Sequence, residues 1–248
     1  MALRNALFAL ATVALVSACA PAPSIETLQA KNTPPVTGAT TLEGLDFPLP
    51  PGEWREVYEF TKPGVAPHAP QRFKVLASVS NGVIDRAAIV YVMRKSRFKN
   101  LWRSFQGCFE DGGPNVHHVE IAANEGGSEP TPDPRLNCWH VRSVSMGRAG
   151  GAHEAIEALH LFAQREGAYM PAVMVGARFV QKRQFDRRDY VEYLWNPDVL
   201  APKLDGVWTP EDWRADAVSQ SAAKRITVDR LTAWAKEWRP GLLGGGSS

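Results

Sequence analysis

Three side chains that could bind a metal ion occur at helical spacing in one segment, namely His153, Glu157 and His160. At 3.6 residues per turn they lie on one side of a helix, within reach of a single ion. Glu157 and His160 also have the Glu-x-x-His spacing of carboxylate-bridged di-iron bundles, but those need a second such pair, which this sequence lacks. The apolar residues of the segment lie elsewhere around the helix, so we expect this stripe to face water and to bind no metal.

A different chemistry is indicated near the start of the chain, where a cysteine follows a short apolar run. Arg4 precedes an apolar stretch at 6–16 that is too short to span a bilayer and is typical of a secretory signal. The sequence Val16-Ser17-Ala18-Cys19 then resembles the lipobox of bacterial lipoproteins. This resemblance implies transfer of diacylglycerol to the Cys19 thiol, cleavage before Cys19, and acylation of the new amino terminus with a fatty acid such as palmitate. An ordinary secretory signal with an incidental cysteine is the alternative.

The same resemblance carries an expectation about location. Ala20, rather than Asp, follows the cysteine. In enterobacterial sorting that choice implies the outer membrane, with the protein facing the periplasm. We therefore expect a lipid-anchored protein of the bacterial cell envelope, attached to the bilayer through acylated Cys19, because several acyl chains make a stable anchor.

Two cysteines remain after the lipidated one, Cys108 and Cys138. An exported protein meets an oxidising compartment, so the expected state of the two thiols is a disulfide between them. The alternative is a catalytic thiol at Cys108 that uses His117 or His118 as its base. We expect these two histidines to lie in a surface loop, because glycines and a proline surround that region.

A basic run with aromatic residues occupies 94–103 and predicts an amphipathic helix at 96–106. Its aromatic residues would pack on a sheet, while its charges would form a positive face that can bind an anionic surface or partner. The five candidate residues for anion or partner binding are Arg94, Lys95, Arg97, Lys99 and Arg103.

The chain has 248 residues, 44% hydrophobic and 22% charged, with a formal net charge of +2. These values are ordinary for a globular protein and do not indicate nucleic-acid binding. We expect a signal peptide at 1–18, a Pro-rich extended tether at 19–51, one domain at 52–240 and a flexible tail at 241–248.

Hydrophobic periodicity predicts an α+β domain: an antiparallel sheet of about five or six strands with two to four helices on one side. Asn81-Gly82 predicts a type I′ hairpin within 71–95 at the centre of that sheet. Further strands are expected at 53–60, at 138–146, from 172 and from 189. Besides 96–106, helices are expected at 151–166, after Thr209-Pro210, and from Ser221 to a stop at Pro240-Gly241.

The sequence contains no recognised catalytic or cofactor motif, so no cofactor or catalytic residue is assigned. We therefore expect a non-enzymatic role in binding or scaffolding another envelope component, which would be a protein, a lipid or a glycan. A hydrolase acting on an envelope polymer or lipid, and a periplasmic carrier of a small ligand or metal, are the alternatives.

Overall fold

The Asn81-Gly82 turn has the backbone that the sequence predicts. The φ angles are 51° at Asn81 and 72° at Gly82, and the turn joins two long strands, β4 (Gln71–Ser80) and β5 (Val83–Arg94). Positive φ at both central residues matches the right-handed twist of the flanking strands. The computed structural model describes residues 28–29, 33–62, 70–94, 113–121, 138–147, 153–183, 187–200 and 208–244.

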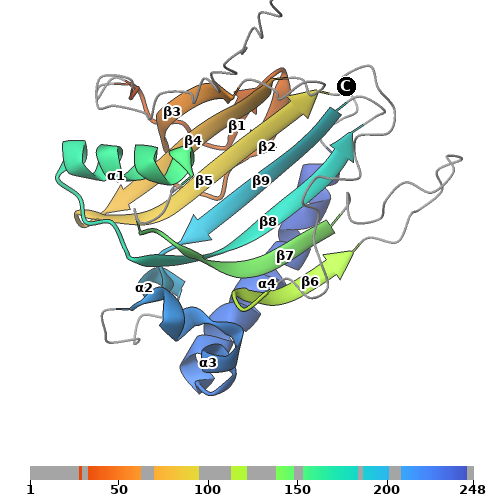
Figure 1. Ribbon diagram of the computed structural model, residues 1–248. Coiled ribbons are helices and arrows are strands. Elements are labelled where there is room, and N and C mark those ends of the chain that lie inside the picture. Colours follow the sequence, from red (N-terminus) through yellow and green to blue (C-terminus); the bar gives the residue numbers. More distant parts are fainter. Residues whose placement is uncertain are drawn as a thin grey trace, which may run out of the picture.

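Seven antiparallel strands make the main sheet, in the order β3-β4-β5-β9-β8-β7-β6 (Figure 1). The remaining strands of this sheet are β3 (Arg55–Lys62), β6 (Val116–Ile121), β7 (Cys138–Ser145), β8 (Val173–Arg183) and β9 (Arg187–Trp195). The predicted α+β class and antiparallel sheet are confirmed, with more strands than expected. The central strand is β9, so the 71–95 hairpin lies to one side of the centre.

The described helices cover both faces of the sheet, not one (Figure 1). Helix α1 (Glu154–Glu166) packs over β3, β4 and β5 on what we call the α1-side face. Helix α4 (Ala222–Gly244) packs over β8 and β7 on the α4-side face, not on the 71–95 hairpin as predicted. Three short helical elements precede α4 in the chain: α2 (Pro197–Leu200), the 3₁₀ helix η4 (Pro210–Trp213) and α3 (Ala215–Ser219). Expecting helices on one side was wrong because the strands are apolar in both directions, and each face needs a cover.

The ends of α1 follow from local chemistry. The ring of His153 accepts a hydrogen bond from the backbone N–H of Ala155, 3.3 Å away, and so caps the helix. Gly167 closes it with a left-handed φ of 66°, which glycine adopts without a steric penalty.

Helix α4 continues through Pro240, where the sequence predicts its end. Leu242, only 2% exposed, packs into the core of the α4-side face and holds the last turn in place. The expected flexible tail at 241–248 therefore begins too early, since Gly244 still belongs to the helix.

Part of the expected tether is also folded. Strands β1 (Ala39–Leu42) and β2 (Leu45–Pro48) form a hairpin, and its Phe47 is fully buried in the α4-side core. The turn between them places Glu43 and Gly44 at positive φ. Glu is uncommon in that conformation, so the sequence gives a weaker hairpin signal here than Asn-Gly does. The predicted domain boundary at residue 52 is consequently too late.

Candidate functional site

The α1-side face carries one continuous row of cross-strand neighbours that spans all seven strands. The backbone register places these residues in sequence across the sheet: Phe60, Phe73, Tyr91, Tyr190, Val180, Cys138 and Ile121. The rings of the first four lie in contact along the row, with centroids 4.7, 4.8 and 4.6 Å apart; the first and last pairs are stacked and the middle pair is tilted. Stacked aromatic pairs of this kind stabilise neighbouring strands beyond the apolar area that they bury.

The next row on the same face changes character in the middle of the sheet. It begins with apolar side chains at Tyr58, Val75 and Ile89 on β3, β4 and β5. It continues through Glu192 on β9, Arg178 on β8 and His140 on β7 before ending at Val119 on β6. Charged side chains therefore occupy the half of this face that lies beyond the strands under α1.

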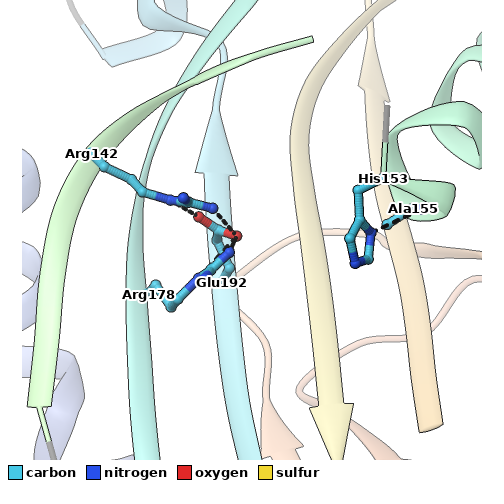
Figure 2. A network of polar contacts seen from close by, with 5 residues as sticks. All are labelled: Arg142, His153, Ala155, Arg178 and Glu192. Atoms are coloured by element: carbon cyan, nitrogen blue, oxygen red, sulfur yellow. Dashed lines mark hydrogen bonds and ion pairs between the residues drawn. The ribbon is translucent and has the colours of Figure 1, made fainter. Parts of the chain in front are cut away.

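Glu192 receives hydrogen bonds from two guanidinium groups (Figure 2). Arg142 donates from Nε to Oε1 at 2.6 Å and from Nη2 to Oε2 at 2.9 Å. Arg178 donates from Nη2 and Nε to Oε2, at 2.7 and 3.2 Å. We refer to these three residues as the Arg–Glu–Arg cluster. Such charge-assisted bonds are roughly twice as strong as those between neutral groups.

A glycine lies between Arg142 and β9 in the next row of the sheet. Gly176 on β8 is the cross-strand neighbour of both Arg142 on β7 and Leu194 on β9. A Cβ atom at Gly176 would lie 2.3 Å from the backbone oxygen of Tyr193 and 2.5 Å from Leu194 Cδ2. Absence of a side chain at this position lets β8 and β9 approach closely and leaves the Arg142 side chain a path across β8 to Glu192.

The pKa values of Glu192 and Arg178 are both shifted in the direction that favours their charged forms. Burial alone would raise the pKa of Glu192, but Arg142 and Arg178 outweigh it and hold that pKa far below its ordinary value. Burial opposes the charge of Arg178, yet Glu192 and Tyr190 raise its pKa above the ordinary value. The Arg178 guanidinium also lies over the ring of Tyr190, 4.6 Å from its centroid, in a cation–π contact.

His140, next to Arg178 in the row, is 8% exposed. Burial lowers its pKa to about 3, and Arg178 and Arg142 act in the same direction. At neutral pH the site therefore contains an ionised carboxylate, two guanidinium groups and a neutral imidazole. General acid–base catalysis works best with a pKa near the operating pH, and neither Glu192 nor His140 has one. The arrangement is suited to holding an anion or a polar group, and poorly suited to moving protons.

The stripe of His153, Glu157 and His160, expected to face water and to bind no metal, is not simply solvated, because His153 and His160 have structural roles. The His153 ring caps the helix and meets Phe73 edge-on, 5.2 Å between centroids, and burial lowers its pKa. His160 donates to the backbone oxygen of Met146. Among the described residues, no group of three His, Cys, Asp or Glu side chains is arranged to hold a metal ion.

The two adjacent histidines lie on strand β6, so the expected surface loop is wrong there. The His118 ring packs in a tilted arrangement against Trp139 of β7, with centroids 4.7 Å apart, and burial lowers the pKa of His118. Burial also lowers the pKa of His117 to about 4. Both imidazoles are therefore neutral at physiological pH.

The other predicted site residues lie largely outside the described part of the chain. Cys138, 4% exposed on β7, belongs to the cross-strand row that runs from Phe60 to Ile121, while Cys108 and Cys19 fall outside the described residues. Of the five basic candidates, Arg94 ends β5, and the other four, Lys95, Arg97, Lys99 and Arg103, lie beyond the described residues. In the described ranges no helix is both long and apolar enough to cross a membrane.

Sequence reasoning missed Arg142, Arg178 and Glu192. Each is a single charged residue on the α1-side face of a predicted strand whose neighbours are mostly apolar. One acidic and two basic residues at inward positions of three strands are a signal for a buried ion cluster, since lone buried charges are too costly. The strand order that brings them together was not available from the sequence.

No family model, curated protein or solved structure matches this chain.

Proposed function

We propose that the protein is a lipid-anchored component of the bacterial cell envelope, on the periplasmic side of the outer membrane, that binds another envelope component without chemical turnover. The observation that supports binding is the Arg–Glu–Arg cluster on the α1-side face. The side chains of Arg142 and Arg178 remain partly exposed, 27% and 17%, beside a Glu192 side chain that is 1% exposed. Fixed charges at a partly exposed position recognise a ligand, whereas catalysis of proton transfer would need groups that titrate near neutral pH.

Binding is tested by crosslinking in intact envelopes, followed by identification of the crosslinked species. The matched control is a reporter protein carried by residues 1–33 of this chain, which has the same anchor without the folded part. We expect adducts that form with the full chain and not with the control. Identical adducts from both would show that the anchor alone sets the neighbourhood, and would contradict a binding role.

A hydrolase is the competing function, and the same preparation tests it. The purified full chain is incubated with isolated cell-wall polymer and with phospholipid vesicles, and soluble products are measured over time. We expect no release above that of a heat-inactivated sample. Release that Glu192→Gln abolishes would contradict the proposed function and assign a catalytic role to this carboxylate.

The anchor is part of the proposal and rests on the lipobox-like residues 16–19. We expect radiolabelled palmitate to be incorporated into the wild-type chain and not into Cys19→Ser. The processed wild-type protein should begin at Cys19 by mass spectrometry. Equal labelling of the two chains, or labelling of neither, would contradict lipidation at this residue.

We also propose that Cys108 pairs with Cys138, which would tie the segment before β6 to β7, the strand next to the edge of the sheet. Closing a loop of this length would stabilise the fold by about 3–4 kcal/mol on the chain-entropy model. Digestion without reductant should give a linked peptide pair. Two thiols that alkylate in the native protein would contradict the pairing and revive the thiol-catalyst alternative.

We propose the basic run at 94–103 as a second region that binds an anionic surface or partner. Replacing Arg94, Lys95, Arg97, Lys99 and Arg103 with Gln should weaken binding of the full chain to anionic vesicles and reduce its salt dependence. Binding that is unchanged, or that ignores salt, would leave these charges with no role in docking.

A further inference from the structure

The Arg–Glu–Arg cluster has one more positive charge than negative. Two guanidinium groups face one carboxylate, and the nearest histidine, His140, adds no charge because it is neutral. Burying an uncompensated charge is costly, so a partly buried cluster of this kind attracts one further negative charge. A single negative charge balances it, whereas a dianion would leave the site overcompensated.

The hydrogen-bond donors of the cluster are only partly used by Glu192. Each arginine contacts this carboxylate through Nε and Nη2, which leaves both Nη1 amino groups outside the pair. Guanidinium nitrogens present a planar fork that matches two oxygens sharing one charge. The exposed fractions, 27% at Arg142 and 17% at Arg178, show that solvent reaches both side chains.

Besides the neutral imidazole of His140, the cluster has apolar and aromatic neighbours on this face. Val119, Ile121 and Tyr190 are partly buried and pack against Val180 and Cys138. Whatever carries the anionic group would therefore meet an apolar surface. An anion that is part of an organic molecule fits this site better than a free inorganic ion does, because the organic part can bury apolar area against these side chains.

We infer that Arg142 and Arg178 form a binding site for a monoanionic group in which two oxygens share the charge, a carboxylate or a phosphodiester, carried on an apolar body. This inference rests on the proposed binding function and names the chemistry of the ligand. Glu192 is then a positioning residue that fixes both guanidinium groups and sets the net charge of the site at one positive unit.

The test uses the full chain in a nonionic detergent and isothermal titration calorimetry. The soluble probes are acetate, hexanoate, dimethyl phosphate and sulfate, with hexanol as the uncharged control. We expect hexanoate to bind more tightly than acetate, and sulfate and hexanol to bind least. A second arm compares vesicles of phosphatidylglycerol and phosphatidylcholine, which separates a lipid-borne phosphodiester from a small free anion.

Three variants give the inference a sharper test. Arg142→Gln should weaken hexanoate or dimethyl phosphate binding by about tenfold to a hundredfold, the usual range for a lost charged hydrogen bond. Arg55→Gln is the matched control, because Arg55 pairs with Glu166 at 3.2 Å on the surface and removal changes the net charge equally. Its affinity should stay within about twofold of wild type, as expected for a screened surface charge.

Glu192→Gln distinguishes a ligand site from a structural ion cluster. It raises the local charge from one to two positive units, so the preference should shift from monoanions toward sulfate. A purely structural cluster would show no such shift. Circular dichroism identifies variants that fail to fold. If Arg142→Gln is one of them, Arg142→Lys replaces it, because lysine keeps the charge but lacks the planar fork of donors. We expect Arg142→Lys to lose affinity to an intermediate extent.

Absence of binding by every probe to the folded wild-type chain would overturn the inference, as would equal affinities of Arg142→Gln and Arg55→Gln. These results would leave the proposed function standing if the envelope crosslinks remain specific to the folded part. Loss of those crosslinks with intact anion binding would instead contradict the proposed function and retain the site.

Discussion

The two halves of the α1-side face share one set of rows but use them differently. Over β3, β4 and β5, the row residues Val75 and Ile89 are buried with Leu159 and Phe162 of α1 in a single apolar cluster. Over β9, β8 and β7, the same row presents Glu192, Arg178 and His140. The first half therefore gains stability from burying apolar area, while the second holds charges whose desolvation is costly.

This difference indicates where function should be sought. Replacing a buried ion cluster by apolar residues is often neutral or stabilising, so such a cluster is weak evidence for stability. The apolar half shows that this face accepts ordinary core packing. The charges on the other half consequently call for a reason beyond folding, which the proposed anion site supplies.

Glu192→Ala should have the largest effect on stability. It leaves two guanidinium groups without their shared carboxylate, and breaking a buried ion pair by removing one partner costs about 3–5 kcal/mol. The free energy of unfolding, measured by urea denaturation at pH 7, should fall by that amount. The control residue is Asp216, which pairs with Arg214 on the surface and has a side chain that is 69% exposed.

The control variant Asp216→Ala should leave the free energy of unfolding nearly unchanged, as surface pairs do. A similar small change for Glu192→Ala would contradict the contrast, because it would mean that solvent already compensates both arginines.

The apolar half was largely predictable and the charged half was not. The hairpin at Asn81-Gly82 and helix α1 follow from short-range signals, a turn dipeptide and a 3.6-residue period, which the chain carries locally. The Arg–Glu–Arg cluster depends on β7, β8 and β9 lying side by side in one register. Arg178 and Glu192 are cross-strand partners on two predicted strands that are consecutive in the chain, but Arg142 joins them only once β7 pairs with β8.

Two other elements escaped prediction because their local signals point the other way. Strand β6 lies among glycine, proline and acidic residues that are typical of loops, and it forms because β7 offers an edge to pair with. The β1–β2 hairpin lies in a Pro-rich segment, and burial of Phe47 under α4 compensates for the poor turn residue Glu43. Tertiary packing overrides local propensity in both cases.

Leu159→Ala tests the apolar half. Leu159 is fully buried between α1 and the sheet, and truncating such a leucine costs about 2–5 kcal/mol because it leaves a cavity. Gln164→Ala, on the exposed side of the same helix, should change stability by less than about 0.5 kcal/mol. Anion binding should survive Leu159→Ala at temperatures where the variant is folded. Loss of binding in the folded variant would show that the two halves of the face are coupled.

The pH dependence of stability sharpens the role of the charged half. The pKa of His140 falls from an ordinary 6.5 to about 3 in the folded protein, so the unfolded chain binds a proton that the folded one does not. Stability from this residue is full above pH 6.5 and is lost as pH falls toward 3, by about 1 kcal/mol per pH unit. The depressed pKa of Glu192 acts in the same direction but only below its ordinary value of 4.5.

Urea denaturation between pH 7 and pH 5 therefore reports the histidines. His140 faces Arg178, Arg142 and Glu192, from β8, β7 and β9, all of which keep their charges in this range. His140→Gln should reduce the slope of stability against pH by about 1 kcal/mol per unit. An unchanged slope would contradict the burial of a neutral imidazole at this position and assign the pH dependence to His117, His118 and His153.

The smallest expected change in stability comes from the largest change in sequence. Replacing Arg142 and Arg178 with Met and Glu192 with Leu removes all three charges of the cluster and keeps its approximate volume. Because apolar side chains avoid the desolvation cost that the ion cluster carries, the free energy of unfolding should stay within about 1 kcal/mol of wild type, or rise. Hexanoate and dimethyl phosphate binding should disappear in the same protein. Stability retained with binding lost would show that the charges serve recognition, as the comparison of the two halves implies. Stability lost by several kcal/mol would show instead that the hydrogen bonds around Glu192 hold β7, β8 and β9 in register. The two halves of the face would then differ in how they stabilise the sheet, and the charges would need no role in recognition.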